Sequence, residues 1–234
     1  VMKRYFKYAI IALCSLLAMP VFTACDNDDF DTNQYVGGIV GQFYSSLKQV
    51  KLTDCCNSSA VTSSYNSNTW VGGIAGFVCA NSAGTILVEN CSNSGPITHN
   101  GNQLAMLGGI AGGCANKNKT VGHDTIQILN CTNSGMISAY GYAGGIVGEN
   151  GNSANDWVGG TVRYCSNSGT VTGNQSIGGI LGKFYHGELS DCENSGDIDG
   201  AGSRVGGIIG QASTRGATLG LKNSSAVISN CSNS

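Results

Sequence analysis

The sequence predicts an all-β protein, a parallel β-helix (a three-sided β-solenoid) of about six coils. Three observations carry this prediction. Two short phrases alternate along the chain, 36 of the 234 residues are glycine, and only 11% are charged. A repeat of fixed period is typical of stacked units that each cover the apolar edge of the next. Low charge with abundant Gly, Ser and Asn favours short strands joined by tight turns.

Residues 1–24 are predicted to be a lipoprotein signal peptide. A basic start precedes an apolar run from Ala9 to Phe22, which is shorter than the about 20 residues of a membrane-spanning helix. The sequence Phe22-Thr23-Ala24-Cys25 resembles a lipobox, although Leu is usual where Phe22 stands. We therefore expect lipid attachment at the Cys25 thiol. The alternative is an ordinary secretory signal with an incidental cysteine.

Residues 25–34 are predicted to be an acidic tether. Four aspartates lie within this short segment: Asp26, Asp28, Asp29 and Asp31. Like charges extend a chain, and an acidic run directly after a lipidated cysteine resembles the surface-export signal of lipoproteins in some Gram-negative phyla. We expect the outer membrane as a partner through the lipid anchor, with the protein on the cell surface.

Residues 35–234 are predicted to be the solenoid repeats, and the copy at 160–182 illustrates one coil. Val162, Tyr164 and Ser166 alternate with Arg163 and Cys165, which is the period of a strand. A turn at 167–169, a short strand at 170–172 and an apolar strand at 177–181 follow. The pattern predicts three strands in each coil, with turns at Asn and Gly.

The first repeated phrase contains a Gly-Gly doublet followed by isoleucine. Ile177 and Ile180 flank one doublet and are three residues apart, so a regular strand would point them to opposite faces. We expect a corner or bulge at Gly178-Gly179 that turns both inward. Stacking would align the isoleucines after the doublets in one interior column: Ile39, Ile74, Ile110, Ile146, Ile180 and Ile208.

The second repeated phrase begins with cysteine. Six of the 11 cysteines share its position: Cys55, Cys91, Cys131, Cys165, Cys192 and Cys231. Stacked in-register side chains have poor torsion for a disulfide, so we expect buried reduced thiols, with disulfide bonds as the alternative. Cys56 is expected to face outward. A bridge between Cys79 and Cys114 is a further possibility. Zinc is not expected, because the column lacks histidine partners and paired cysteines.

Asparagine occupies the next shared position of this phrase. The six residues are Asn57, Asn93, Asn133, Asn167, Asn194 and Asn233. Stacked amides can hydrogen-bond along a β-structure, since each carries both a donor and an acceptor. We expect a structural ladder with no catalytic role.

The Gly-Gly-Ile/Leu-x-Gly phrase followed by Cys-x-Asn-Ser-Gly-x-Ile/Val resembles the GLUG-motif repeats of bacterial surface proteins. This resemblance covers residues 35–234 and implies a right-handed β-helix of pectate-lyase-like type. GLUG repeats accompany adhesin-like proteins and some IgA-cleaving metallopeptidases, in which the peptidase is a separate domain. The chain has no His-Glu-x-x-His motif, so peptidase activity is not implied.

Candidate site residues are few, and we expect no catalytic residue, no cofactor and no bound metal. His99, His123 and His186 are predicted to be exposed loop residues. A weak calcium candidate is the acidic group Asp191, Glu193, Asp197 and Asp199. A β-helix polysaccharide lyase or hydrolase would use such acids with Lys183 or Arg204 as the base. A formal net charge of −2 without a basic face does not favour nucleic acid.

The function that we expect is an adhesin-like surface lipoprotein that binds a glycan or a host or matrix protein. Outward aromatic residues would make the contacts: Tyr44, Tyr65, Trp70, Tyr140, Tyr142 and Trp157. The alternatives are a non-binding stalk that presents a downstream domain, and the lyase or hydrolase above. No capping segment precedes Ser234, and we expect the solenoid to be truncated there.

Overall fold

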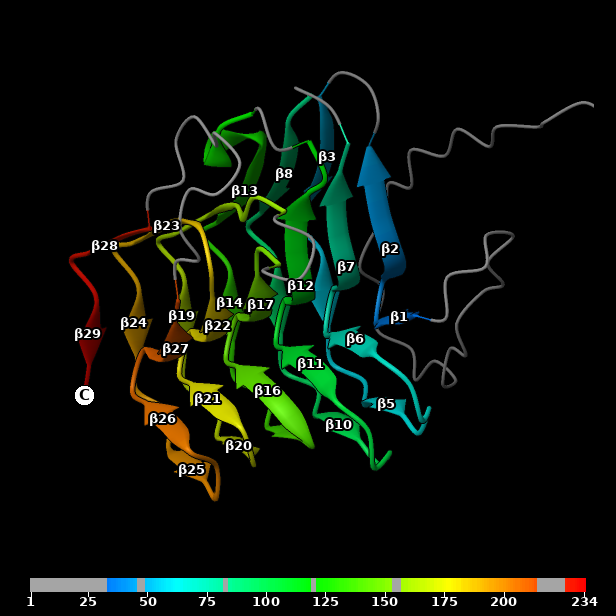
Figure 1. Ribbon diagram of the computed structural model, residues 1–234, viewed down its shortest axis with the longest axis vertical. Helices are drawn as coiled ribbons and strands as arrows, with labels where there is room; N and C mark the ends of the chain where they lie inside the picture. Colours follow the sequence, from blue (N-terminus) through cyan, green and yellow to red (C-terminus); the bar gives the residue numbers. More distant parts are fainter. Residues whose placement is uncertain (1–32, 46–48, 82–83, 119–120, 153–156, 214–225) are drawn as a thin grey trace, which may run out of the picture.

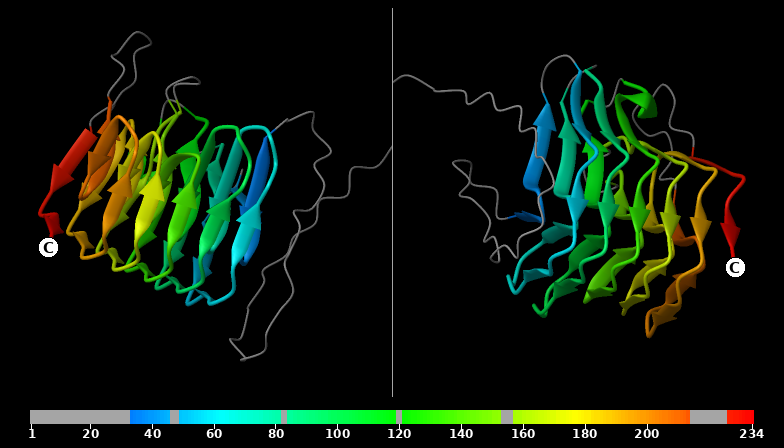
Figure 2. Two further views of the ribbon diagram at one scale, coloured as in Figure 1. Left: turned by 90° about the horizontal axis from the view of Figure 1, so that it is seen from below. Right: turned by 180° about the vertical axis from the view of Figure 1, so that it is seen from behind.

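The computed structural model describes residues 33–45, 49–81, 84–118, 121–152, 157–213 and 226–234. The predicted signal peptide, the lipid attachment at Cys25 and most of the acidic tether lie outside the described residues. Five complete coils and four strands of a sixth stack side by side along one axis (Figures 1 and 2). The prediction of an all-β parallel solenoid is confirmed.

Each complete coil contributes one strand to each of five sheets, which we name A to E in chain order. Sheet A contains β1 (Gln34–Gly37), β6 (Thr69–Gly72), β11 (Ala105–Gly108), β16 (Gly141–Gly144), β21 (Ser176–Gly178) and β26 (Arg204–Gly206). Sheet B contains β2 (Val40–Ser45), β7 (Ala75–Ala80), β12 (Ala111–Asn116), β17 (Val147–Asn150), β22 (Leu181–Phe184) and β27 (Ile209–Ala212). Sheet C contains β3 (Val50–Thr53), β8 (Ile86–Glu89), β13 (Ile126–Leu129), β18 (Thr161–Arg163), β23 (Gly187–Ser190) and β28 (Ala226–Ser229).

The last two sheets are built from shorter strands. Sheet D contains β4 (Cys56–Asn57), β9 (Ser92–Asn93), β14 (Thr132–Asn133), β19 (Ser166–Asn167), β24 (Glu193–Asn194) and β29 (Ser232–Asn233). Sheet E contains β5 (Val61–Ser63), β10 (Ile97–His99), β15 (Ile137–Ala139), β20 (Val171–Gly173) and β25 (Ile198–Gly200). The described residues contain one helix, the short 3-10 helix η1 (His123–Thr125). None of the described segments forms a helix with the length and hydropathy needed to cross a bilayer.

A coil has five short strands where the sequence predicted three. The strand expected at 162–166 ends at Arg163, because Tyr164 has a φ of +55° and turns the chain into sheet D. The corresponding residue of every coil is left-handed: Asp54, Asn90, Asn130, Tyr164, Asp191 and Asn230. Asn and Asp tolerate this conformation. The expected strand at 177–181 is likewise divided between β21 and β22.

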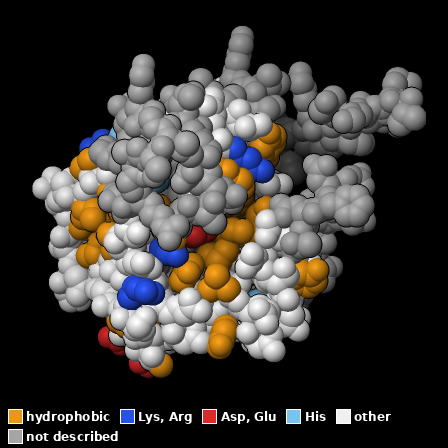
Figure 3. All heavy atoms as spheres, in the orientation of Figure 1, with side chains coloured by type: hydrophobic (Ala, Val, Ile, Leu, Met, Phe, Trp, Pro, Cys, Tyr) orange, Lys and Arg blue, Asp and Glu red, His pale blue; other side chains and the backbone are white. Residues whose placement is uncertain are grey.

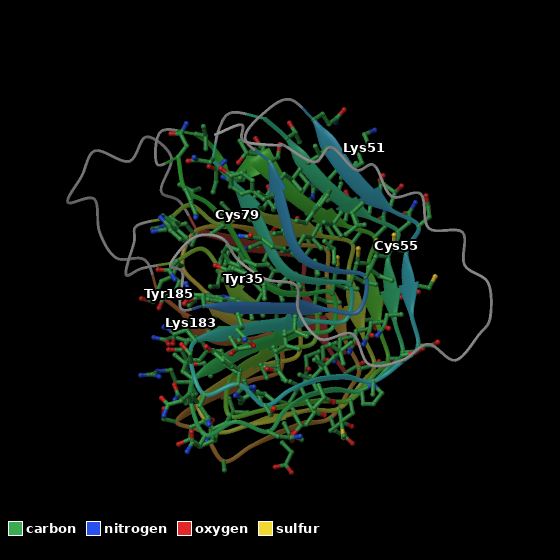
Figure 4. The ribbon with its side chains drawn as sticks, turned by 90° about the vertical axis from the view of Figure 1, so that its right-hand side faces the viewer. Tyr35, Lys51, Cys55, Cys79, Lys183 and Tyr185 are labelled. Atoms are coloured by element: carbon green, nitrogen blue, oxygen red, sulfur yellow. The ribbon has the colours of Figure 1, made fainter. Side chains whose placement is uncertain are left out.

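The interior is divided into two apolar clusters, which appear as two lobes when the solenoid is viewed along its axis (Figure 4). The larger cluster lies among sheets B, C and D, and the smaller one lies between sheets A and E. Ile177 is buried in the smaller cluster and Ile180 in the larger. The Gly-Gly corner therefore turns both side chains inward, as predicted, but into different lobes.

The two lobes join at a narrow waist where the Gly-Gly doublets meet the asparagines. A Cβ on Gly109 would lie 2.4 Å from Cγ of Asn133 and 2.3 Å from the carbonyl oxygen of Gly145. A Cβ on Gly108 would lie 2.0 Å from the carbonyl oxygen of Ala111. Glycine is needed here because another backbone approaches too closely for any side chain. The two repeated phrases therefore pack against each other.

Candidate functional site

Two rows of side chains line the side of the solenoid where the outer faces of sheets A and B meet, and we call this region the aromatic corner. The sheet A row is Tyr35, Trp70, Met106, Tyr142, Ser176 and Arg204. The sheet B row is Gln42, Phe77, Gly113, Glu149, Lys183 and Gln211. Each row changes residue type from coil to coil, which distinguishes the corner from the repeated interior columns.

The N-terminal half of the corner is a closed aromatic cluster. The Trp70 ring centroid lies 5.4 Å from that of Tyr35 and 5.2 Å from that of Phe77. Trp157 packs on Phe77 at 6.4 Å. Gly113 makes room for the indole, because a Cβ there would lie 2.5 Å from Cδ1 of Trp70. Trp70 is only 5% exposed, so the expectation that it contacts a ligand is wrong.

Glu149 lies at the centre of the corner. It is 6% exposed, and its Oε2 accepts a hydrogen bond of 3.3 Å from the indole N–H of Trp70. Burial raises the pKa of the Glu149 carboxyl to about 7, although Lys183 on the next coil and the Trp70 hydrogen bond act in the opposite direction. A buried carboxyl with such a pKa changes charge near neutrality.

The C-terminal half of the corner is polar and more open. Lys183 donates a hydrogen bond of 3.0 Å from Nζ to the Tyr142 hydroxyl, and its Nζ lies 4.3 Å from the Tyr142 ring centroid. The Tyr185 ring centroid lies 4.6 Å from the same atom. Arg204 is exposed at the end of the row. Figure 4 places Lys183, Tyr185, Tyr35 and Cys79 on the same side of the solenoid, opposite Cys55.

The six asparagines form a continuous hydrogen-bonded ladder at the waist. Each Nδ2 donates to Oδ1 of the asparagine in the next coil, at 2.7–2.8 Å. From Asn93 to Asn194, Nδ2 also donates at 2.8–2.9 Å to the carbonyl oxygen of the glycine two residues later. The amides are thus used for stacking, which is a structural role.

The cysteines of the repeat form a column in the larger core. Five are buried, and Cys231 is partly exposed. All the cysteines in the described residues are free thiols. Burial is the main cause that raises the pKa of the Cys165 thiol. Cys56 is exposed. Cys79 lies in the outer aromatic cluster whereas Cys114 lies in the inner core, so the two do not face each other and the suggested bridge is wrong.

The four acids of the calcium candidate lie on different parts of the coil. Asp191 is at the left-handed corner, Glu193 is in β24, Asp197 precedes β25 and Asp199 is within β25. Asp191 accepts hydrogen bonds from Asn230 at 3.1 Å and from Arg163 at 3.4 Å. The bond from Asn230 and the Arg163 guanidinium hold the pKa of the Asp191 carboxyl below its usual range. The structure does not bring the four carboxylates together.

The structure groups a different set of possible metal ligands. In the described residues, one ligand atom each from His123, Asp124 and Glu188 lies within 4.8 Å of the others. One imidazole with two carboxylates is a donor set that zinc or manganese accepts. Arg163, however, lies 3.6 Å from Glu188 and adds a positive charge. The sequence pattern did not indicate this group, because Glu188 comes from a coil far along the chain.

The histidines are less exposed than predicted. His99 and His186 are buried, with exposed fractions of 6% and 3%. His123 is partly buried in η1. The prediction of exposed loop residues is therefore wrong for both: His99 is the last residue of strand β10, and His186 lies in the short turn between β22 and β23, which packs on the coil.

Comparison with known proteins supports the repeat assignment. The family model described as "The GLUG motif" matches residues 139–172, which confirms the resemblance on one copy of the repeat. Halomucin from Haloquadratum walsbyi is 34% identical over 114 residues. This match covers 44% of the chain and 1% of halomucin. No solved structure matches the chain. These matches concern the repeat alone, because the chain spans only a small part of the length of halomucin.

Proposed function

Starting from GLUG-motif repeats folded as a parallel β-solenoid, we propose that the chain is the repeat region of a surface lipoprotein that binds glycans. It is anchored through Cys25 in the outer membrane and faces the exterior. The signal-like segment before Cys25 and the acidic run after it support this proposed anchoring and surface exposure. The solenoid supplies a rigid frame on which side chains lie at the strand spacing of about 4.8 Å.

The variation within the aromatic corner carries the binding proposal. A non-binding stalk needs only the repeated core, the asparagine ladder and the Gly-Gly corners. The corner instead places a different residue in each coil, with aromatic, cationic and amide groups next to one another. Flat aromatic faces beside polar groups are features of ligand sites, where a few polar groups give orientation.

Exposed tyrosines extend this polar and aromatic surface beyond the corner. Tyr65 and Tyr140 are 44% and 46% exposed and lie between a strand of sheet E and the following strand of sheet A. Tyrosine combines an apolar ring with a hydroxyl that can donate and accept hydrogen bonds. Such groups suit the alternating apolar and hydroxyl surfaces of sugar rings.

The second candidate function is a stalk, which the uniform ladder and core favour. Display of the full chain on a Gram-negative cell separates the two functions. Binding of the cells to immobilised mucin or a glycan panel, with loss in a Tyr140→Ala/Tyr142→Ala variant, would support the binding proposal. A displayed chain that binds none of the glycans would favour the stalk.

The proposed lipid anchor and surface exposure can be tested separately from binding. Growth with a radiolabelled fatty acid should label the full chain and not a Cys25→Ala variant, and proteinase added to intact cells should degrade the labelled protein. An unlabelled chain recovered from the medium would contradict the anchor.

A further inference from the structure

We propose that the C-terminal half of the aromatic corner binds acidic polysaccharides, with Lys183 and Arg204 as the groups that meet the anionic sugars. This inference rests on the proposed glycan-binding function and names its ligand class. The site consists of Tyr142, Lys183, Arg204 and Gln211 around the fully buried Ser176, and all five are neighbours in the two rows of the corner.

The register places the two cations on one small surface. Arg204 pairs with Ser176 in sheet A, and Lys183 pairs with Gln211 in sheet B. A hydrogen bond of 3.3 Å between Ser176 Oγ and Gln211 Oε1 joins the two sheets between them. Lys183 and Arg204 therefore lie at opposite ends of one diagonal of a four-residue patch, and the bonded Ser176–Gln211 pair forms the other diagonal.

Lys183 and Arg204 have no direct ion-pair partner within the described part of the chain, although the buried Glu149 carboxyl beside Lys183 interacts with its charge. No ion pair involving Lys183 or Arg204 is found there. Arg163, on sheet C, by contrast lies near both Glu188 and Asp191. The whole chain has a formal net charge of −2, so the two unpaired cations do not reflect a generally basic protein. They leave a local positive potential that an anionic ligand can satisfy.

Lys183 is held in place before any ligand arrives. Its ammonium group bonds to the Tyr142 hydroxyl and lies over the rings of Tyr142 and Tyr185. An ammonium group has three donors, so contact with Tyr142 leaves donors for a carboxylate or sulfate oxygen. A side chain that is already ordered loses less conformational entropy on binding. Arg204 adds a planar fork that suits carboxylates.

The arrangement along the axis favours a linear polymer. Successive coils present successive side chains, and apolar and charged groups lie together on this face of the molecule (Figure 3). Within the five-residue patch, acid groups are absent. The nearest carboxyl in the rows is that of Glu149, which pairs with Lys183 but is buried. An extended anionic chain could follow the rows without meeting an exposed carboxylate from the patch itself.

The test measures binding of polygalacturonate, its methyl ester, dextran sulfate and an acidic peptide to cells that display the full chain. We expect both acidic polysaccharides to bind, and the neutral ester to bind at least 10-fold more weakly. Lys183→Met and Arg204→Met should each weaken binding at least 10-fold. Lys51→Met is the matched control, because Lys51 is exposed on sheet C, away from the corner (Figure 4). Higher salt should weaken binding by the wild type.

The outcomes separate this inference from the proposed function. Equal binding of the ester and the acid, or unchanged binding by both variants, would overturn the acidic ligand class and leave glycan binding intact. Binding of the acidic peptide alone would also overturn it. If no glycan binds at all, both proposals fail. Arg204 is exposed, so its variant tests the idea even if Lys183→Met lowers display.

Discussion

Two regions on either side of the Gly-Gly doublets follow opposite rules. At the waist, asparagine recurs in all six coils and each amide bonds to the next. In the aromatic corner, no residue type fills a whole row. An amide is both donor and acceptor, so it is complementary to a copy of itself. Self-complementary columns demand repetition, whereas an outward row permits each coil to differ.

The difference teaches where to look for function in a repeat protein. Repeated residues are explained by the contacts between coils. Trp70, Glu149 and Lys183 break the repeat and contact one another or their neighbours across coils. Variation on a uniform frame therefore marks the candidate site, and substitutions at each region should have different consequences.

The largest loss of stability is expected for a substitution in a Gly-Gly doublet, which connects the strands of sheets A and B. Gly109→Ala would force a Cβ to within 2.3 Å of the Gly145 carbonyl oxygen and against Asn133. We expect a loss of about 4 kcal/mol or failure to fold, since backbone cannot move aside cheaply. Urea unfolding followed by circular dichroism measures the loss. Gly122→Ala is the control, because no atom lies within 4 Å of its added Cβ. Equal stability of the two variants would contradict the claim that close packing at the waist requires glycine at position 109.

A pH-dependent effect should be confined to the corner. Burial raises the pKa of Glu149 from 4.5 to about 7, so the folded state keeps a proton that the unfolded chain releases. Its stabilising contribution is present below pH 4.5 and is lost as pH rises through about 7, by about 3 kcal/mol in total. Glu149→Gln should remove this part of the dependence. The measurement is the free energy of unfolding of the wild type and of Glu149→Gln from pH 4 to 9. The same pH dependence in both proteins would contradict the raised pKa of Glu149.

A somewhat smaller loss is expected from one break in the ladder. Asn133→Ala removes the bonds to Asn93 and Asn167, and it takes one amide donor from the buried Asn167 Oδ1 and from the Gly135 carbonyl oxygen. Among the described residues, Oδ1 of Asn167 keeps only the Gly169 N–H at 3.3 Å. We expect destabilisation of about 2–3 kcal/mol, because several buried hydrogen bonds are lost at once. Chemical unfolding compares this variant with Asn102→Ala, whose side chain is exposed. A similar midpoint for both would show that the ladder adds no stability.

The smallest effect should come from the thiol column. Cys131→Ala removes one buried sulfur and is expected to cost about 1 kcal/mol. Cys56→Ala should change stability very little, because Cys56 is exposed. A thiol reagent should modify Cys56 in the native protein and the column only after unfolding. Rapid native modification of Cys131 would contradict its burial.

Much of the fold could be predicted because the same residue types recur at a nearly constant spacing along the sequence. The isoleucine, cysteine and asparagine columns follow from period alone, since in-register stacking places equivalent residues together. The five-strand coil was missed, although Asn or Asp before most of the repeated cysteines is a signal for left-handed corners. In the copy at 160–182 this position is occupied by Tyr164, and tyrosine seldom adopts a positive φ, so that copy did not indicate a left-handed corner.

The candidate site was harder to predict. Tyr142 was noted as an outward aromatic residue, and Lys183 and Arg204 as alternative bases of a lyase or hydrolase, but nothing in the sequence places Tyr142 beside the two cations. Trp70 was expected among the outward aromatic residues that contact a ligand. Packing on Phe77 and the hydrogen bond to Glu149 bury it instead.

The sequence by itself determined the stacking direction, because periodic residues meet their own counterparts in adjacent coils whatever the shape of the coil. Only the tertiary structure decided what meets across a coil: the asparagine ladder on the Gly-Gly doublets, the two lobes, and the cations beside tyrosines. Those contacts depend on the angle of every corner. Corner angles result from backbone fit between segments many residues apart, which a repeat period does not encode.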